Sequence, residues 1–214
     1  MPHRVPRGAV CVPAAALVVI VTADVLAHGP LTHLDHVVHR FDAAHVQGVR
    51  ATAAETLAAI GQRWVLLCLI VPLAAVAGVR TRSWRYPLVS ALIVAVLSLL
   101  QTLLKSLIPR TYPVGGKDLL FEYGDAYPSG HTLNAFVLVW VALELLVVAA
   151  PALAVRLPSE RRLALALTTG LVAGIGLTLA DYHWLTDVLA SWGIGPLLLV
   201  PLIAARPFDR PQRP

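Results

Sequence analysis

The chain has 214 residues, of which 57% are hydrophobic and 14% are charged, and its mean hydropathy is +0.73. These values lie far from those of a soluble domain of this length and indicate an integral membrane protein. The net charge of +5 does not by itself indicate nucleic-acid binding, because the placement of the charges has to decide. No internal repeat and no separately folding appendage is evident, so we expect one domain over residues 1–214.

Six apolar runs have about the length that a helix needs to cross the hydrocarbon core of a bilayer. We therefore predict an all-α polytopic membrane protein with six transmembrane helices in one bundle. The second run is short, and we extend it back to Leu57 because Arg63 can snorkel to the membrane interface. The runs are Ala9–Ala27, Trp64–Val79, Tyr86–Leu104, Ser129–Ala150, Leu163–Ala180 and Val188–Ala205.

The basic residues are divided unevenly between the two sides that these spans define. By the positive-inside rule, the richer side is cytoplasmic and holds both termini, and we expect a multi-pass protein of the plasma (inner) membrane. A secretory signal at the N-terminus is less favoured, because Ala23-Asp24-Val25 is a poor cleavage site. The richer side carries Arg4, Arg7, Arg80, Arg82, Arg85, Arg156, Arg161, Arg162, Arg206, Arg210 and Arg213, and the other side carries Arg40, Arg50, Arg63, Lys105, Arg110 and Lys117.

The loop after the first span, from His28 to about Thr56, carries five of the eight histidines. A metal site is one interpretation. However, ligands spaced three apart drift around a helix and cannot all reach one ion. We therefore expect an amphipathic helix on the outer surface. Its apolar arc consists of Leu31, Leu34, Val37, Val38 and Phe41, and its opposite arc of His33, His36 and His39.

The loop from Lys105 to Tyr127 is rich in proline and glycine, so we predict an irregular, repeatedly turning segment. It should bring Lys105 and Arg110 close to His131 at the outer ends of neighbouring spans. Lys105 is notable because the chain has 15 arginines and only two lysines. The turn-forming residues are Pro109, Pro113, Gly115, Gly116 and Gly124.

The segment Tyr127-Pro128-Ser129-Gly130-His131 opens the fourth span. A helix that begins at Ser129 directs free backbone N–H groups and its positive dipole end at an anion, with His131 in its first turn. His183 and Asp187 precede the sixth span, four residues apart, and share one face if that segment is helical. These residue types suit a nucleophile, its orienting carboxylate and a general acid around a phosphate.

Lys105, Pro128-Ser129-Gly130-His131 and His183-x-x-x-Asp187, in that order at the ends of the spans, resemble the motifs of the type 2 phosphatidic acid phosphatase superfamily. The resemblance covers the six-span body. It implies a membrane phosphatase that acts on lipid phosphates or pyrophosphates without a metal or other cofactor, and a helical core shared with vanadium haloperoxidases. The implied partners are the bilayer and an isoprenoid or glycerolipid phosphate, and no nucleic acid.

Carried over by residue, the resemblance makes His183 the nucleophile, Asp187 its orienting carboxylate and His131 the acid on the leaving oxygen. Lys105, Ser129 and the Gly130 N–H would hold the phosphoryl oxygens. The expected reaction passes through a phosphohistidine at the extracytoplasmic face, and water then attacks with His131 as the base. A general acid of this kind typically accelerates a reaction by about 10²–10⁴-fold.

Two places depart from the family pattern. The Arg-Pro pair expected seven residues after the lysine is Tyr112-Pro113 here, and Arg110 is our candidate for the missing phosphate contact. The Ser-Arg pair expected before the nucleophile is Gly176-Leu177. Leucine cannot replace a bidentate guanidinium, and losing one transition-state donor costs about 10²–10³ in rate. An alternative is therefore an impaired relative that binds a lipid phosphate without turnover.

Other interpretations of these residues stay open. Ser129 can act only as a helix cap, and His183 with Asp187 can form only a helix-surface hydrogen bond. A zinc site from His131, His183, Asp187 and Asp181 is chemically possible, although a lysine and a helix N-terminus favour an anion over a cation. A haloperoxidase-like oxidation catalyst is disfavoured by the small, membrane-embedded body.

Overall fold

The computed structural model describes residues 7–209, and Arg4, Arg210 and Arg213, which contribute to the predicted orientation, lie outside them. All regular structure of the described residues is helical, apart from an isolated bridge between Arg110 and Leu120. The helices are α1 (Arg7–Ala27), α2 (Pro30–His45), α3 (Val49–Ala59), α4 (Arg63–Thr81), α5 (Arg85–Leu107), α6 (Gly130–Ala149), α7 (Ser159–Leu179) and α8 (Leu185–Ala205), with a 3-10 turn η1 (Pro151–Leu153).

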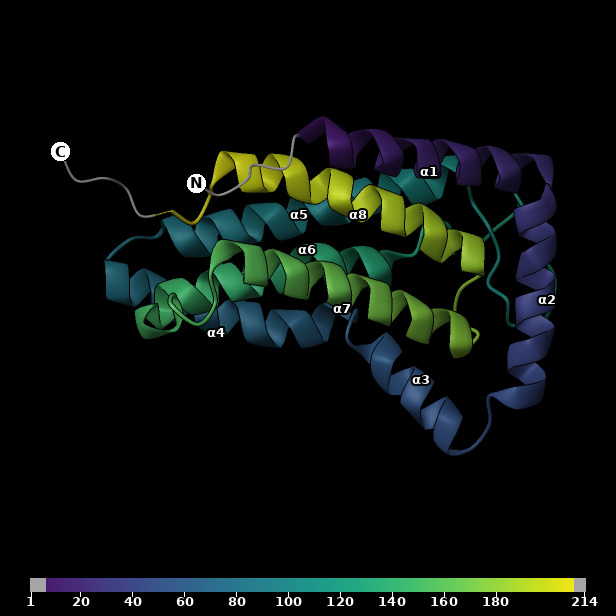
Figure 1. Ribbon diagram of the computed structural model, residues 1–214, viewed down its shortest axis with the longest axis horizontal. Coiled ribbons are helices and arrows are strands. Elements are labelled where there is room, and N and C mark those ends of the chain that lie inside the picture. Colours follow the sequence, from purple (N-terminus) through teal and green to yellow (C-terminus); the bar gives the residue numbers. More distant parts are fainter. Residues whose placement is uncertain (1–6, 210–214) are drawn as a thin grey trace.

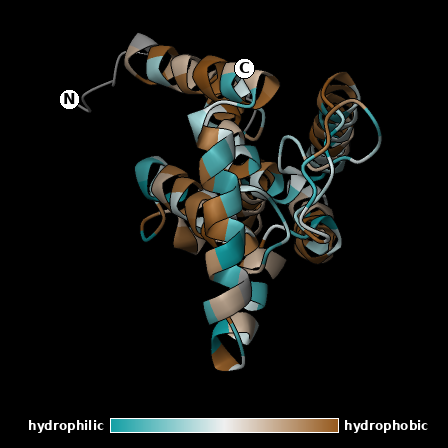
Figure 2. Ribbon diagram, turned by 90° about the vertical axis from the view of Figure 1, so that its right-hand side faces the viewer, coloured by the Kyte–Doolittle hydropathy of each residue, from teal (hydrophilic) through white to brown (hydrophobic). Residues whose placement is uncertain are grey.

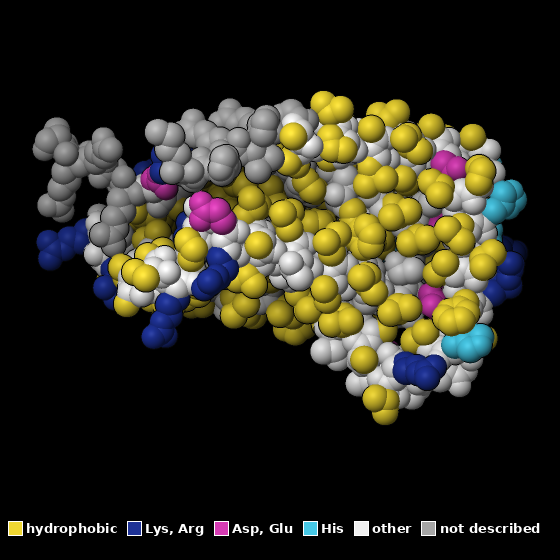
Figure 3. Space-filling view, viewed as in Figure 1, with side chains coloured by type: hydrophobic (Ala, Val, Ile, Leu, Met, Phe, Trp, Pro, Cys, Tyr) yellow, Lys and Arg dark blue, Asp and Glu magenta, His cyan; other side chains and the backbone are white. Residues whose placement is uncertain are grey.

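Among the described residues, α1 and α4 to α8 are the six helices long and apolar enough to cross a membrane. They lie lengthwise beside one another (Figure 1). Apolar side chains cover the visible face between the two ends of the bundle (Figure 3). The predicted all-α class and six spans are confirmed, and the chain is a multi-pass membrane protein. The boundaries shift by a few residues, because hydropathy alone does not locate helix caps.

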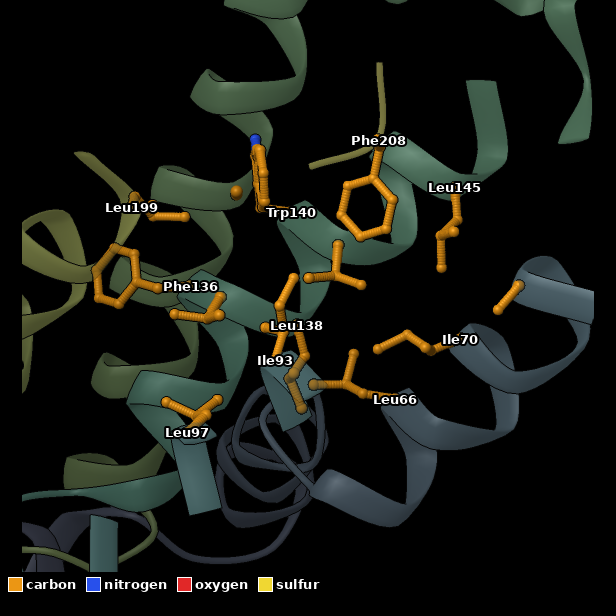
Figure 4. Close-up of a cluster of buried hydrophobic side chains, with 14 of the residues drawn as sticks. Leu66, Ile70, Ile93, Leu97, Phe136, Leu138, Trp140, Leu145, Leu199 and Phe208 are labelled. Carbon is orange, nitrogen blue, oxygen red and sulfur yellow. The ribbon is translucent and has the colours of Figure 1, made fainter. Parts of the chain in front are cut away.

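Helix α6 lies at the centre of the bundle and contacts α4, α5, α7 and α8. It is the most buried of the spans, with 67% of its apolar stretch inside the protein. This burial fits a helix that is hydrophobic on all sides. Phe136, Leu138 and Trp140 belong to the main cluster of buried side chains that joins α6 to its neighbours (Figure 4). The packed centre gives the first turn of α6 a fixed position at one end of the bundle.

We call the end of the bundle that carries His131 and His183 the histidine end. Helix α2 lies across this end (Figures 1 and 2). The amphipathic helix predicted here is present, and it buries Asp35 against the bundle, because that carboxylate accepts hydrogen bonds there from Arg110 and from the Thr186 backbone nitrogen. The buried residues of α2 include Thr32, Asp35 and Asp42, and its exposed residues include Leu34, Val37 and Phe41.

The second span does not extend back to Leu57, which corrects the prediction. A turn at residues 60–62 separates α3 from α4, and α4 begins at Arg63. A Cβ at Gly61 would lie 2.3 Å from the backbone oxygen of His131, so only glycine lets the turn approach the first turn of α6 this closely. Asn134 Nδ2 donates to the Gly61 oxygen at 3.2 Å. The break therefore places the start of α4 beside His131.

Candidate active site

His183 and Asp187 meet at the start of α8. Asp187 lies in the first turn of the helix, where its Oδ2 accepts a hydrogen bond from the Trp184 backbone nitrogen at 3.1 Å. The same oxygen lies 3.3 Å from Nδ1 of His183, which precedes the helix. Both side chains are buried. The pair predicted from its spacing is present, but helix capping positions it rather than a shared helical face.

His131 lies in the first turn of α6 and faces His183, with 6.3 Å between the ring centroids. Ser129 caps α6, because its Oγ accepts from the Thr132 backbone nitrogen at 3.4 Å. The backbone nitrogen of Ser129 also donates to the carbonyl oxygen of Asp187 at 3.2 Å. This bond ties the N-termini of α6 and α8 together, so the two histidines and the carboxylate lie in one place.

Two cavities meet at His131, and His183 lines one of them. The polar cavity has a volume of about 330 Å³ and the apolar cavity one of about 450 Å³, and His131 and Tyr112 line both. The polar cavity is lined by Arg63, Ser98, Gln101, Thr102, Lys105, Tyr112, Asp125, Gly130, His131 and Asn134. The apolar cavity is lined by Ala58, Gln62, Tyr112, Val114, His131, Leu177, Tyr182 and His183.

Lys105 passes directly over the start of α6, because a Cβ at Gly130 would lie 3.5 Å from Lys105 Cε. Its Nζ donates to the backbone oxygen of Asp125 and lies 3.4 Å from the carboxylate of that residue. The Tyr112 hydroxyl donates to the other carboxylate oxygen at 2.6 Å. Burial raises the pKa of Asp125, but the bond from Tyr112 and the charge of Lys105 outweigh it and hold the pKa below its ordinary value. Asp125 is therefore an anion within the polar cavity.

Ser129, a predicted phosphate contact, lines neither cavity. It is fully buried at the N-cap, and its Oγ also accepts from the Thr132 hydroxyl at 3.0 Å. The structure therefore gives Ser129 the capping role that serine commonly has at this position.

Arg110, the other predicted phosphate contact outside the cavities, is fully buried among carboxylates. Nε and Nη2 donate to the two oxygens of Asp118 at 2.7 and 2.5 Å, and Nη2 also donates to Asp35 at 2.8 Å. Nη1 donates to Asp187 at 2.7 Å and to the Thr186 hydroxyl at 2.6 Å. Burial lowers the pKa of Arg110, but the three carboxylates outweigh it and raise the pKa above its ordinary value. All five donors of the guanidinium are used, so none is left for a phosphate.

Several side chains of the polar cavity were not expected from the sequence, and three of them form one hydrogen-bonded chain. Arg63 Nη2 donates to Gln101 Oε1, and Gln101 Nε2 donates to Asn134 Oδ1 at 2.9 Å and to the Gly130 oxygen at 3.3 Å. Gln101 and Asn134 are polar groups inside apolar spans, a costly placement that is itself a signal of a site. Arg63 stands where an interfacial anchor is expected, so no sequence signal marks it.

The two carboxylates considered as zinc ligands are bound to other residues. Asp187 is bound by Arg110, and Asp181 Oδ1 lies 2.8 Å from His39 Nδ1. Over residues 7–209, no group of three or more histidines, cysteines or acids is arranged to hold a metal ion.

Comparisons with known proteins identify the family of the chain and a solved structure with a similar fold. The family model described as the PAP2 superfamily matches residues 82–210, a segment that contains Lys105, both histidines and Asp187. The fold is similar to that in the crystal structure of the first transmembrane PAP2 type phosphatidylglycerolphosphate phosphatase from Bacillus subtilis. The TM-score is 0.72 and the identity is 22%, with 94% of this chain and 98% of that chain covered. No match was found among curated proteins.

Proposed function

The chain belongs to the PAP2 superfamily, as its motifs predicted, and from this premise we propose that it hydrolyses a phosphate ester or anhydride carried by a membrane lipid. The observation that carries the proposal is the arrangement of the two histidines. His183 is bound to Asp187, and its ring centroid lies 6.3 Å from that of His131. The polar cavity beside His131 is lined by Lys105 and by Gly130, the first residue of α6. A phosphoryl group placed there has a nucleophile on one side and an acid on the other.

His183 is the nucleophile of the proposed reaction. When its Nδ1–H donates to Asp187, the lone pair of the neutral ring is on Nε2. Nε2 attacks phosphorus, a P–N bond forms and the bond from phosphorus to the lipid oxygen breaks. Asp187 fixes the tautomer and stabilises the positive charge that develops on the ring.

His131 is the general acid of the first step and the base of the second. Its imidazolium proton passes to the leaving oxygen, so the lipid alcohol departs neutral. The neutral ring of His131 then accepts a proton from water while the water oxygen attacks the phosphohistidine. The P–N bond breaks, inorganic phosphate is released, and both histidines return to their starting states.

Lys105 and the first turn of α6 hold the phosphoryl oxygens in this proposal. The backbone N–H groups of Gly130 and His131 have no acceptor among the described residues, as is usual for the first turn of a helix. They form an anion-binding helix N-terminus. Ser129 contributes by capping this turn. Arg110 is a positioning residue, because it binds Asp187, which in turn orients His183.

The substrate is proposed to be a lipid phosphate because the histidines lie at the ends of membrane-spanning helices, at the depth of a phosphate headgroup. The similar Bacillus subtilis protein is named for phosphatidylglycerolphosphate. That glycerolipid therefore joins phosphatidate and isoprenyl phosphates as a candidate substrate.

The orientation in the membrane is also a proposal: the histidine end faces away from the cytoplasm of a cell whose plasma membrane holds the protein, and both termini are cytoplasmic. The support is the excess of arginine in the segments at the opposite end. Single cysteines at Lys117 and Arg82, without Cys11 and Cys68, test this orientation. An impermeant thiol reagent applied to intact cells should label position 117 and spare position 82, and the reverse pattern would invert the orientation.

Phosphate release from a panel of lipid phosphates by the purified protein tests the proposed reaction. We expect hydrolysis of at least one lipid at a rate that EDTA leaves unchanged, and a strong loss with the chelator would instead indicate a metal site. Binding of lipid phosphates without release from any of them would support the second candidate, an impaired binding protein. The observation behind that candidate is Leu177, which is 1% exposed and puts an apolar side chain where the family pattern has arginine.

A further inference from the structure

The two arginines of the family pattern have no replacement at their own positions. Tyr112 donates its hydroxyl proton to Asp125, and Leu177 forms part of the wall of the apolar cavity. Arg110 has no donor left. The motifs alone therefore leave Lys105 as the cation for the phosphoryl group. A phosphate monoester carries about −1.5 to −2 charge at neutral pH, so one lysine balances only part of it.

Arg63 brings a second cation to the same cavity from a different helix. It is the first residue of α4 and lines the polar cavity together with Lys105 and His131. Gly61, in the turn before Arg63, contacts the backbone of His131 so closely that a Cβ on Gly61 would lie 2.3 Å from the His131 oxygen. Arg63 follows Gly61 by two residues, so this close contact brings the start of α4 to the cavity.

The guanidinium of Arg63 is held in place but not neutralised. Nη2 donates to the Gln101 amide oxygen, and Gln101 is itself fixed by its bonds to Asn134 and Gly130. In the part of the chain that the structure describes, no carboxylate lies within ion-pairing distance of Arg63, and its other N–H groups have no acceptor. A partly buried cation with free donors attracts an anion, and the planar fork of arginine matches two oxygens of a phosphoryl group.

We propose that Arg63 binds the phosphoryl oxygens of the substrate and takes the part of the arginine that is missing at positions 112 and 177. This inference rests on the proposed function and adds a second binding cation to it. The ligand class is a tetrahedral oxyanion with about two negative charges. Lys105 from α5, Arg63 from α4 and the N-terminus of α6 contact it from three helices.

Orthovanadate, a tetrahedral analogue of phosphate, is the probe for this assignment, and titration calorimetry measures its affinity without any need for turnover. Arg63→Gln should weaken vanadate binding by about 10–100-fold, the size expected for the loss of a charge-assisted contact. Arg63→Lys should fall between, because it keeps the charge and loses the fork. Arg50→Gln, which removes an exposed arginine of α3, should bind as the wild type does. Wild-type affinity in a folded Arg63→Gln variant would overturn the assignment.

Arginine modification of the wild-type protein by phenylglyoxal, mapped by mass spectrometry, tests the same contact without a substitution. Saturating vanadate should slow the modification of Arg63 and leave that of Arg50 unchanged, and equal rates at Arg63 with and without vanadate would overturn the assignment. Lipid-phosphate hydrolysis separates the two proposals. A wild type that binds vanadate through Arg63 but releases no phosphate contradicts hydrolysis and supports Arg63 as an anion ligand. A hydrolysing wild type whose Arg63→Gln variant keeps its vanadate affinity and kcat/KM supports hydrolysis and contradicts the role of Arg63.

Discussion

Arg110 and Arg63 lie at the same end of the bundle and carry the same guanidinium, but their surroundings are opposite. Arg110 is fully buried, and its five donors are used by three carboxylates and a hydroxyl. Arg63 donates to one neutral amide, that of Gln101, and faces a cavity. The first arginine is balanced within the protein, and the second is not.

An arginine that lies near a motif in the sequence is therefore not necessarily the one that binds the substrate. Arg110 is two residues from the family position and is the natural candidate in the sequence, yet its charge is balanced by buried acids. Arg63 precedes every motif residue and still reaches the cavity. A guanidinium attracts a phosphate only if the protein leaves part of its charge and some of its donors uncompensated.

The largest expected effects come from the two histidines. Arg110 binds Asp187, which orients His183, so these substitutions test whether the residues that Arg110 supports carry out the reaction. His183→Ala should abolish phosphate release because no nucleophile remains. His131→Ala should lose about 10²–10⁴-fold on lipid substrates but spare an aryl phosphate, whose good leaving group needs no acid. Initial rates on both substrate types check this. Equal residual rates of the two variants on the aryl phosphate would refute the assigned roles.

Arg110→Gln tests the balanced side of the comparison. It should destabilise the protein by about 3–5 kcal/mol, because it leaves buried carboxylates of Asp35, Asp118 and Asp187 unpaired. The melting temperature in detergent measures the loss. Arg63→Gln is the matched control and should change the melting temperature little. An Arg110→Gln variant with normal stability and weakened vanadate binding would exchange the roles of the two arginines.

Leu177→Arg sharpens the comparison by returning a guanidinium to the family position. It should raise a weak wild-type activity, and in the Arg63→Gln background it should restore up to about 10²-fold in kcat/KM. A buried arginine that misses its anion is costly, so the melting temperature is measured alongside. Leu177→Met, which keeps an apolar side chain, is the control. A folded double variant without recovery would show that position 177 does not reach the phosphoryl group.

Asp125→Asn tests the acidic residue that lines the polar cavity together with Arg63 and Lys105. It should lower KM for a lipid phosphate roughly two- to fivefold and leave kcat nearly unchanged. The reason is that Lys105 then binds the phosphoryl group without first breaking its ion pair with Asp125. The effect is small because the Asp125 side chain is 62% exposed and its charge is screened. Glu122→Gln, an exposed acid of the same loop, should leave KM unchanged. An equal change in both variants would indicate a general effect of surface charge.

Asp42→Asn extends the comparison to an unpartnered carboxylate on α2. Both oxygens of Asp42 are buried without a hydrogen bond, and burial followed by the charge of Asp181 raises its pKa from 3.8 to about 6, with His39 partly opposing. The folded state therefore favours the protonated acid, and this stabilisation is complete below the unfolded pKa and is lost as the pH rises through about 6.

Asp42→Asn should consequently melt a few degrees above the wild type near neutral pH, and the difference should shrink as the pH falls below about 6. Melting temperatures across this range check the sign. Glu55→Gln, which changes an exposed acid of α3, should run parallel to the wild type at every pH. A difference between Asp42→Asn and the wild type that stays constant with pH would contradict the raised pKa.

The sequence by itself determined the membrane class, the six spans, the family, the helix cap at Ser129 and the His183–Asp187 pair. These features are local. The thickness of the bilayer sets the length of an apolar run. Ser129 caps the helix that begins beside it, and His183 and Asp187 meet within one helix start. Short-range geometry of this kind can be read directly from residue spacing.

Only the tertiary structure decided which charges face the substrate. The partners of Arg110 come from α2, from its own loop and from α8, and the place of Arg63 depends on the contact of Gly61 with His131. The burial of Asp35 on α2 has the same origin, because its hydrogen-bonding partners come from the Arg110 loop and from α8. The balance of a buried charge depends on its neighbours in space, and a local sequence pattern does not record them.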